Sequence, residues 1–351
     1  MTSKPPYRVP TMQEIRDLPW NGFNAISTFS GGGGSSTGYR MAGFRILWAS
    51  EFIDSARETY AANKAPYTVL DGRDIRQVKA EDILHAIGMK PGELDLFDGS
   101  PPCASFSTAG KREAGWGKVK KYSDKAQRTD DLFFEFSRLV RGVQPKTFVA
   151  ENVSGLVKGT AKGYFIEIMK ELKLCGYRVA CKVLDAQWLG VPQMRQRTIF
   201  VGVREDLGID PAHPKPLPYQ YTVRDAIGDV YGVPEKEADI SRYAIGREWE
   251  KLKPGQGSAK YLNLKRTRID GAAHCISADG GSPSTAGVCH PTERRKFTIA
   301  ELKQICGFPP DYILAGTYAQ QWERCGRAVP PVMMMHIAAA VRDNILAKVA
   351  I

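Results

Sequence analysis

Two consecutive prolines, Pro101 and Pro102, constrain the fold of this chain more than any other feature. They follow a short apolar stretch, residues 94–97, which we predict to be a strand. Because proline lacks a backbone N–H and fixes its φ angle, the pair excludes helix and ladder pairing and forces a rigid loop. Cys103 follows at the tip of that loop, where α/β sheets place their chemistry, so it is a candidate nucleophile, with a buried structural thiol as the competing interpretation.

A run of four glycines, residues 31–34, follows a predicted strand at residues 25–29 and precedes a predicted helix at residues 35–41. Glycine lets a backbone approach a ligand closely, and the amides at a helix N-terminus suit an anionic or carbonyl group. The dinucleotide fingerprint is broken because Ser36 occupies its third glycine position. The run therefore predicts a ligand-binding turn, with a flexible loop as the competing interpretation.

Acidic residues follow the next two predicted strands. Glu51 comes after residues 46–49, and Asp74 comes after residues 68–70. An acid at the tip of the second strand hydrogen-bonds a ribose in nucleotide-binding α/β folds, because one carboxylate matches two hydroxyls. Either acid taken singly is equally compatible with an ordinary surface position.

Further predicted strands and helices follow one another along the chain. Further strands are expected at residues 146–150, 178–184 and 198–203, and further helices at residues 12–18, 131–140, 164–174 and 332–346. Glu151, Asn152 and Val153 follow the first of these strands. Gln193, Arg195 and Arg197 precede the last one, and alternation places all three side chains on one face of a strand, where they would suit a nucleotide.

These blocks, in this order and spacing, resemble the cytosine-5 DNA methyltransferases of prokaryotic or phage type, over about residues 27–341. The resemblance implies an α/β, Rossmann-like S-adenosylmethionine-dependent methyltransferase sheet with a second, smaller target-recognition domain. It places the catalytic and cofactor-binding domain at residues 1–204, with residues 324–351 returning to it. The target-recognition domain is then residues 205–323, with a readout core at about 205–294.

The resemblance also assigns the catalytic roles. Cys103 would attack the cytosine ring, Glu151 would hydrogen-bond or protonate ring N3, and Arg197 would contact the cytosine O2. Arg195 would activate the thiol or fix a nearby phosphate, and Asn152 would orient the loop. The base must leave the stacked duplex for this chemistry, as methyltransferases acting on DNA bases require.

Cofactor contacts carried over from the family include the glycine turn, the two acids at strand tips and a late segment. They are Phe29, Gly31, Gly33, Gly34, Glu51, Phe52, Asp74, Ile75, Ser100, Pro102, Leu132, Arg327, Ala328 and Val329. The residues expected to bind DNA are Lys111, Arg112, Gln193, Lys265, Arg266 and Arg268. Lys111 and Arg112 open a Gly- and Lys-rich stretch that resembles the mobile loop with which the family closes over DNA. Three positions depart from the family pattern: Ala104 replaces a usual Gln, and Asp185 and Arg327 each replace a usual Asn.

Charge and composition agree with a polyanionic partner. Lysine and arginine outnumber aspartate and glutamate by 49 to 38, giving a net charge of +11. No apolar run is long enough for a membrane helix, so we expect a cytoplasmic protein that binds no membrane. The resemblance implies double-stranded DNA as the partner, and we expect a monomer. Seven cysteines without a Cys-x-x-Cys pair argue against disulfides and a zinc site, and we expect no metal. A cognate restriction endonuclease is an open possibility.

Three other functions compete with this interpretation. One branch of the same family methylates cytosine in transfer RNA, which would keep the chemistry and change the polymer. A non-catalytic DNA-binding relative is disfavoured by the presence of Cys103 and Glu151. An oxidoreductase that uses a dinucleotide is disfavoured by the broken glycine fingerprint.

Overall fold

The structure is a computed structural model that describes residues 4–102, 120–122, 125–127, 131–157, 162–228, 230 and 233–349. The chain divides into two compact units. Unit 1 contains Met1–Asp17, Asp185–Arg195 and Pro216–Met334, and unit 2 contains Leu18–Leu184, Gln196–Lys215 and Met335–Ile351. The grouping differs from the predicted domains at four segments. Residues 1–17, 185–195 and 324–334 group with most of the target-recognition region in unit 1, whereas residues 205–215 group with unit 2.

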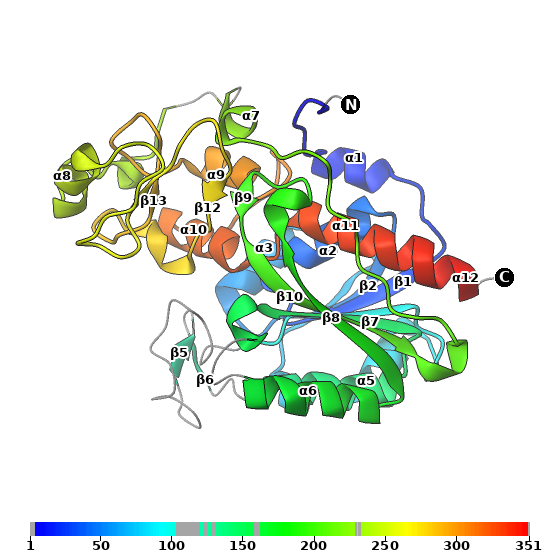
Figure 1. The fold of residues 1–351 in the computed structure, drawn as a ribbon. Coiled ribbons are helices and arrows are strands. Elements are labelled where there is room, and N and C mark those ends of the chain that lie inside the picture. Colours follow the sequence, from blue (N-terminus) through cyan, green and yellow to red (C-terminus); the bar gives the residue numbers. More distant parts are fainter. Residues whose placement is uncertain are drawn as a thin grey trace. The chain divides into compact units, whose positions relative to one another are not determined.

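Unit 2 is built on a seven-stranded sheet with the order β3-β2-β1-β4-β7-β10-β8 (Figure 1). Its strands are β1 (Asn24–Thr28), β2 (Arg45–Ser50), β3 (Val69–Asp71), β4 (Leu96–Gly99), β7 (Thr147–Val153), β8 (Tyr177–Asp185) and β10 (Gln196–Arg204). The pairs β1–β2, β2–β3, β1–β4 and β4–β7 are parallel, whereas β10 runs antiparallel to β7. The carboxyl ends of the parallel strands therefore share one edge, where such sheets bind ligands.

Helices cover both faces of this sheet. They are α2 (Gly34–Met41), α3 (Asp54–Asn63), α4 (Ala80–Ile87), α5 (Leu132–Val143) and α6 (Lys162–Leu174). Figure 1 shows α5 and α6 on one side of the strands and α2 on the other. The α5 side holds the main apolar core, in which Phe133 and Phe136 meet Phe97 and Phe200 with ring centroids 5.2–5.5 Å apart. Burying each such ring contributes roughly 1.5–3 kcal/mol, so this face fixes α5 against the sheet.

The observed elements agree with the predicted ones, with two differences that concern the site. The strand β4 begins two residues later than predicted and ends at Gly99. The strand β7 continues to Val153, so Glu151 and Asn152 belong to the strand instead of following it. The extension arises because β10 pairs with these residues, with Glu151 opposite Ile199 and Val153 opposite Arg197.

The carboxyl-terminal helical segment consists of α11 (Pro331–Val341), a π-helical turn (Arg342–Leu346) and α12 (Ala347–Val349). Within unit 2, the Arg342 guanidinium donates to the carbonyl of Ala42 at 2.9 Å. A hairpin of β5 (Lys120–Tyr122) and β6 (Lys125–Gln127) also belongs to unit 2. In the described part of the chain, no helix is long and apolar enough to cross a membrane.

Unit 1 contains short elements and little sheet. Its helices are α1 (Met12–Asp17), α7 (Val223–Ile227), α8 (Ala244–Lys251), α9 (Ile299–Ile305) and α10 (Tyr318–Arg327). Two strand pairs join β9 (Gln193–Met194) to β12 (Ala273–His274) and β11 (Lys265–Arg266) to β13 (Val288–Cys289). A small apolar cluster lies around Trp249, with Ile240, Ile245 and Leu264.

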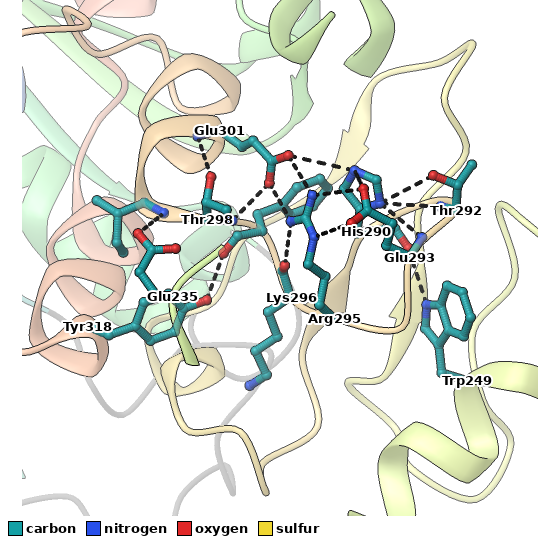
Figure 2. A network of polar contacts seen from close by, with 12 residues as sticks. Glu235, Trp249, His290, Thr292, Glu293, Arg295, Lys296, Thr298, Glu301 and Tyr318 are labelled. Atoms are coloured by element: carbon teal, nitrogen blue, oxygen red, sulfur yellow. Dashed lines mark hydrogen bonds and ion pairs between the residues drawn. The ribbon is translucent and has the colours of Figure 1, made fainter. Parts of the chain in front are cut away.

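Buried polar contacts organise much of this unit (Figure 2). The Arg295 guanidinium donates to both carboxylate oxygens of Glu301 at 2.7 and 2.8 Å, and to Glu293 at 3.0 Å. Glu301 also accepts from the backbone N–H of Thr298, which begins α9. Burial, with Arg295 nearby, lowers the pKa of His290. Removing one member of this network would leave a buried charge unpaired. The network therefore favours one arrangement of the segments that it joins.

Lys296 is a second buried organiser of unit 1, with no exposed surface. Its ammonium donates to the carbonyls of Gly280, Ser282 and Thr285. It also lies 5.6 Å from the ring centroid of Trp322. Burial lowers its pKa to about 8. One side chain therefore fixes the whole loop that leads to β13.

Candidate active site and cofactor site

The proline loop leaves β4 in a fixed direction. At Gly99, a Cβ atom would lie 2.5 Å from the Phe136 ring, so only glycine fits there. The Asn152 side-chain amide donates to the carbonyl of Pro101 at 3.2 Å, which is the loop-orienting contact expected of it. Cys103, and with it Ala104, lies outside the described residues, as do Lys111 and Arg112.

Three of the six described cysteines, Cys175, Cys181 and Cys289, differ from a reactive thiol. Burial raises the pKa of both Cys181 and Cys289 to about 12, and it also raises the pKa of Cys175. A thiol with a raised pKa stays protonated near neutral pH and is a poor nucleophile. The role of Cys103 as the nucleophile remains a prediction from the sequence.

Glu151 and Arg197 form an ion pair across β7 and β10. The Arg197 Nε lies 2.7 Å from Glu151 Oε1, and Glu151 is 9% exposed. A second nitrogen of Arg197 donates to the carbonyl of Gln196 at 2.7 Å. The paired strands thus bring together two residues that are 46 positions apart in the chain, and each orients the other.

The expectation that Gln193, Arg195 and Arg197 line one face of one strand is wrong. Gln193 lies in β9, which pairs with β12 in unit 1, whereas Arg197 lies in β10 of unit 2. Arg195 is 1% exposed and donates to the carbonyls of Ile276 at 3.1 Å and Gly326 at 2.8 Å. The strand breaks because these unit 1 acceptors hold Arg195, so only Arg197 pairs with Glu151. The roles of Arg195 at the thiol and of Gln193 at DNA remain predictions.

The glycine turn adopts the backbone conformation that its sequence requires. Phe29, Gly31 and Gly33 have φ angles of 54°, 54° and 89°, all in the left-handed region. Gly33 directly precedes α2, so the turn presents the first amides of that helix. A Cβ atom at Gly31 would meet nothing within 4 Å, which leaves open space beside the turn.

Glu51 joins the tip of β2 to this turn. Its carboxylate accepts from the backbone N–H of Gly31 at 2.7 Å and from that of Ile53 at 2.6 Å, and the side chain is 7% exposed. The two features singled out in the sequence, the glycine run and the acid of the second strand, are therefore in direct contact. Phe52, the next residue, is half-buried.

Asp74 follows β3, the third strand in chain order, and precedes a short 3₁₀ turn. The Arg76 guanidinium pairs with Asp74 at 3.1 Å and with Asp131 at 2.7 Å. Ile75 and Leu132, also expected at the cofactor, are buried at 5% and 2% exposure. Ser100 and Pro102, at the end of β4, are half-buried in the same unit. Unit 2 therefore contains all the predicted cofactor residues except the late segment.

That late segment lies in unit 1, at the end of α10. Arg327 is the last residue of the helix, and its Nε donates to Glu323 at 2.6 Å. Ala328 has extended backbone angles, and Val329 is buried. Their part in cofactor binding remains a prediction.

The basic residues expected at DNA divide into two kinds. Arg266 donates to the carbonyls of Pro291 at 2.9 Å and Leu252 at 2.8 Å, and its guanidinium carbon lies 3.9 Å from the Trp249 ring centroid. Its donors are thus used inside unit 1. The Arg268 side chain is 62% exposed, and its contact with Asp270 is 4.0 Å long. Lys265, in β11, is half-buried.

Sequence reasoning missed Asp98, a buried acid inside β4. Its carboxylate accepts from Ser27 Oγ at 2.8 Å and from the Tyr39 hydroxyl at 3.1 Å. Burial raises its pKa to about 7. The available signal was an acid within an apolar strand, one residue before Gly99. In the described residues, no cluster of three or more His, Cys, Asp or Glu could hold a metal ion.

The protein-family model described as C-5 cytosine-specific DNA methylase matches residues 23–343 of this chain. The chain belongs to this family. The Type II methyltransferase M1.HphI of Haemophilus parahaemolyticus is 32% identical over 339 residues, covering 90% of this chain and 86% of the relative. The Type II methyltransferase M.PspPI of Psychrobacter sp. (strain TA137) is 32% identical over 360 residues, covering 94% and 81%.

Solved structures show the same fold at lower sequence identity. A DNA modification methyltransferase encoded within an E. coli prophage matches with a TM-score of 0.73 and 21% identity, covering 93% of this chain and all of that chain. Spodoptera frugiperda DNMT2 matches with a TM-score of 0.66 and 18% identity, covering 94% and 100%. The Rossmann-like methyltransferase fold expected from the sequence is thereby confirmed.

Proposed function

We propose that this protein is a DNA (cytosine-5)-methyltransferase, which transfers a methyl group from S-adenosylmethionine to C5 of a cytosine flipped out of duplex DNA. The observation that carries the proposal is the Glu151–Arg197 pair on adjacent strands, in the unit where Asn152 anchors the proline loop that leads to Cys103. A carboxyl group, a guanidinium and a thiol are the groups that activation of a cytosine ring requires.

The chemistry follows from the poor nucleophilicity of C5 in an aromatic ring. The Cys103 thiolate adds to C6, forming the S–C6 bond and moving the electron pair toward C5. Glu151 hydrogen-bonds or protonates N3, which draws charge from C6 during attack, while Arg197 contacts O2 and keeps Glu151 oriented. C5 then accepts the methyl group from the sulfonium of S-adenosylmethionine. The methyl–sulfur bond breaks with its electron pair left on sulfur, so S-adenosylhomocysteine is the leaving group. Loss of the C5 proton to a base, for which water suffices, expels the thiolate and restores the ring.

The residues of unit 2 fit S-adenosylmethionine, which supplies a methyl group on a sulfonium when bound. The open space at Gly31 admits a ligand to the turn, and the α2 amides suit its amino-acid carboxylate. The backbone N–H groups of Gly31 and Ile53 fix the Glu51 carboxylate at the turn, where a carboxylate matches two ribose hydroxyls. Asp74 suits the adenine. Buried Ile75 follows it in sequence, and buried Leu132 follows Asp131, which shares the Arg76 guanidinium with Asp74.

Glu51→Ala and Asp74→Ala should each weaken S-adenosylmethionine binding by about 1–3 kcal/mol, the usual effect of leaving polar groups unpaired. Glu51→Gln, which keeps one acceptor oxygen, should lose less than Glu51→Ala. Calorimetry on the purified variants measures the affinities. Asp71→Ala is the matched control, because that acid lies at the end of β3 but pairs with Arg73 at 2.7 Å. Unchanged affinity in both alanine variants would place the cofactor elsewhere.

The polymer is proposed to be duplex DNA rather than transfer RNA. Residues 205–294 are long enough for a separate recognition region, and the two relatives that are 32% identical to this chain are Type II methyltransferases. Phosphate contacts from basic side chains would offset the few kcal/mol needed to flip the base. We also propose a cognate restriction endonuclease as a partner of the same system.

Purified protein incubated with methyl-labelled cofactor should label duplex DNA, and mapping of methylcytosines should find them at one short sequence. Transfer RNA in the same assay should stay unlabelled, because the recognition region is proposed to read a duplex. Label in transfer RNA alone would replace this proposal by the RNA-directed one. Label in neither polymer would favour the non-catalytic alternative.

A further inference from the structure

Asp98 occupies the middle of the sheet in unit 2 and is 1% exposed. Its ladder neighbours are Ser27 on β1 and Val149 on β7. A buried carboxylate is expensive unless it is paired. Asp95, near the other end of the same strand, has the Lys146 ammonium at 2.7 Å. Within the described part of the chain, no cation forms such a pair with Asp98.

Two hydroxyl groups take the place of a cation at Asp98. Ser27 donates to one carboxylate oxygen and Tyr39 to the other. The Ser30 hydroxyl in turn donates to the Ser27 carbonyl at 3.0 Å and lies 3.1 Å from the Ser27 hydroxyl. All four side chains are buried. A chain of hydrogen bonds therefore leads from β4 through Ser27 into the glycine turn, and through Tyr39 into α2.

The turn itself needs such support. Phe29 has a left-handed φ of 54°, which is unfavourable for a bulky side chain and persists only where its surroundings impose it. Ser30 is the next residue, and its backbone N–H donates to the Ser50 carbonyl at 3.0 Å while its side chain joins the Asp98 network. We propose that the Asp98 carboxylate is a positioning group that holds residues 29–34 in the cofactor-binding conformation.

This inference rests on the proposed function, and it predicts a pH dependence. The ionised carboxylate accepts both hydroxyl protons, whereas the protonated acid must donate and so loses one of these contacts. Besides Tyr39 on α2, the titratable group that acts on Asp98 is Glu151 on β7. Burial raises the pKa of Asp98 to about 7, with Glu151 adding to the shift. Cofactor affinity should therefore rise with pH through neutrality.

The raised pKa of Asp98 also determines how the stability of the folded protein changes with pH. The folded-state pKa of Asp98 lies above its ordinary value, so the folded protein binds this proton more tightly than the unfolded chain. Stability from this group is therefore present at low pH and is lost as pH rises through about 7.

The test compares wild type, Asp98→Asn and the matched control Asp95→Asn, by calorimetric titration with S-adenosylmethionine in the absence of DNA. Wild type should bind about tenfold more tightly at about pH 8 than at about pH 6. Asp98→Asn should bind about tenfold more weakly than wild type at the higher pH and show no pH dependence. Asp95→Asn should keep the wild-type pH profile. Thermal unfolding should show Asp98→Asn at least as stable as wild type above neutral pH.

An Asp98→Asn protein with wild-type affinity and pH profile would overturn the inference and leave the proposed function intact. If wild type bound no cofactor at either pH, the proposed function would fail instead. Should Asp98→Asn not fold, Ser30→Ala and Tyr39→Phe decide the question, because each removes one hydroxyl and leaves the acid. Both should weaken binding severalfold, and unchanged affinity in both would equally overturn the inference.

Discussion

Replacing Cys103 by serine is expected to abolish methyl transfer while S-adenosylmethionine binding stays intact. An alcohol is far less ionised than a thiol at neutral pH, so the attack on C6 loses its nucleophile. This variant leaves the proposed cofactor residues of unit 2 unchanged, above all Glu51 at the glycine turn. It should therefore still bind S-adenosylmethionine. Single-turnover transfer to duplex DNA measures the first effect, and calorimetry measures the second. A rate within about tenfold of wild type would remove Cys103 from its role.

A matched control and a chemical trap sharpen this experiment. Cys181→Ser replaces a half-buried thiol whose pKa is raised to about 12, and it should transfer at the wild-type rate. DNA with 5-fluorocytosine at the target position traps the adduct, because fluorine cannot leave C5 as the proton does. Wild type and Cys181→Ser should form a covalent complex when the cofactor is present. Cys103→Ser should form none, and a wild-type protein without an adduct would count against covalent catalysis.

Exchanging residues 205–294 for the matching region of a relative with another target is expected to move the methylation site to that target. The catalytic residues are occupied with one cytosine and one cofactor, so neighbouring base pairs must be read elsewhere. Base edges are read by side chains such as Arg and Lys, supported by sequence-blind phosphate contacts. Sequencing of methylated DNA reads the outcome. An active chimera that kept the original target would show that specificity lies outside this region.

Point variants in the region should separate its two kinds of basic residue. Arg268→Ala should cost about 1–3 kcal/mol at one base position, as expected for an exposed arginine that contacts guanine. Lys251, whose side chain is 74% exposed, suits a phosphate contact, so Lys251→Ala should weaken all sites alike and flatten the salt dependence. Arg266→Ala should instead destabilise the unit, because its guanidinium is bonded to two carbonyls and stacked on Trp249.

The sequence was informative wherever local chemistry sets the structure. Apolar strands, the glycine turn and the double proline each restrict the backbone directly, so β1, β2, α2 and α5 lie where the pattern predicts them. Ordered blocks also identified the pair Glu151 and Arg197, which the structure brings to 2.7 Å. These features depend on residue type and short-range spacing, which a single sequence displays.

Long-range contacts of buried polar groups were not predictable in the same way. The alternation rule placed Arg195 beside Arg197, but an acceptor 131 residues away, at Gly326, holds it in the other unit. The sequence does not distinguish Arg266 from Arg268, whereas in the structure Arg266 donates to two backbone carbonyls. Asp98 lacked any motif, since its significance lies in Ser27 and Tyr39, about 60–70 residues earlier in the chain.

The pairing of β9 with β12 has a consequence for how this lineage acquires new targets. Gln193 and Met194 form backbone ladder contacts with Ala273 and His274, and the Gln193 side chain accepts from the Ile276 N–H at 3.2 Å. A hybrid chain that switches from one parent to the other after residue 195 would contain β9 from the first parent and β12 from the second. Because the ladder contacts are between backbones, we expect such hybrids to keep this strand pair with little sequence matching. The contact between residues 193 and 276 joins segments from the two parents. Hybrids that lose this contact should be selected against first, and substitutions at the two positions should be inherited together.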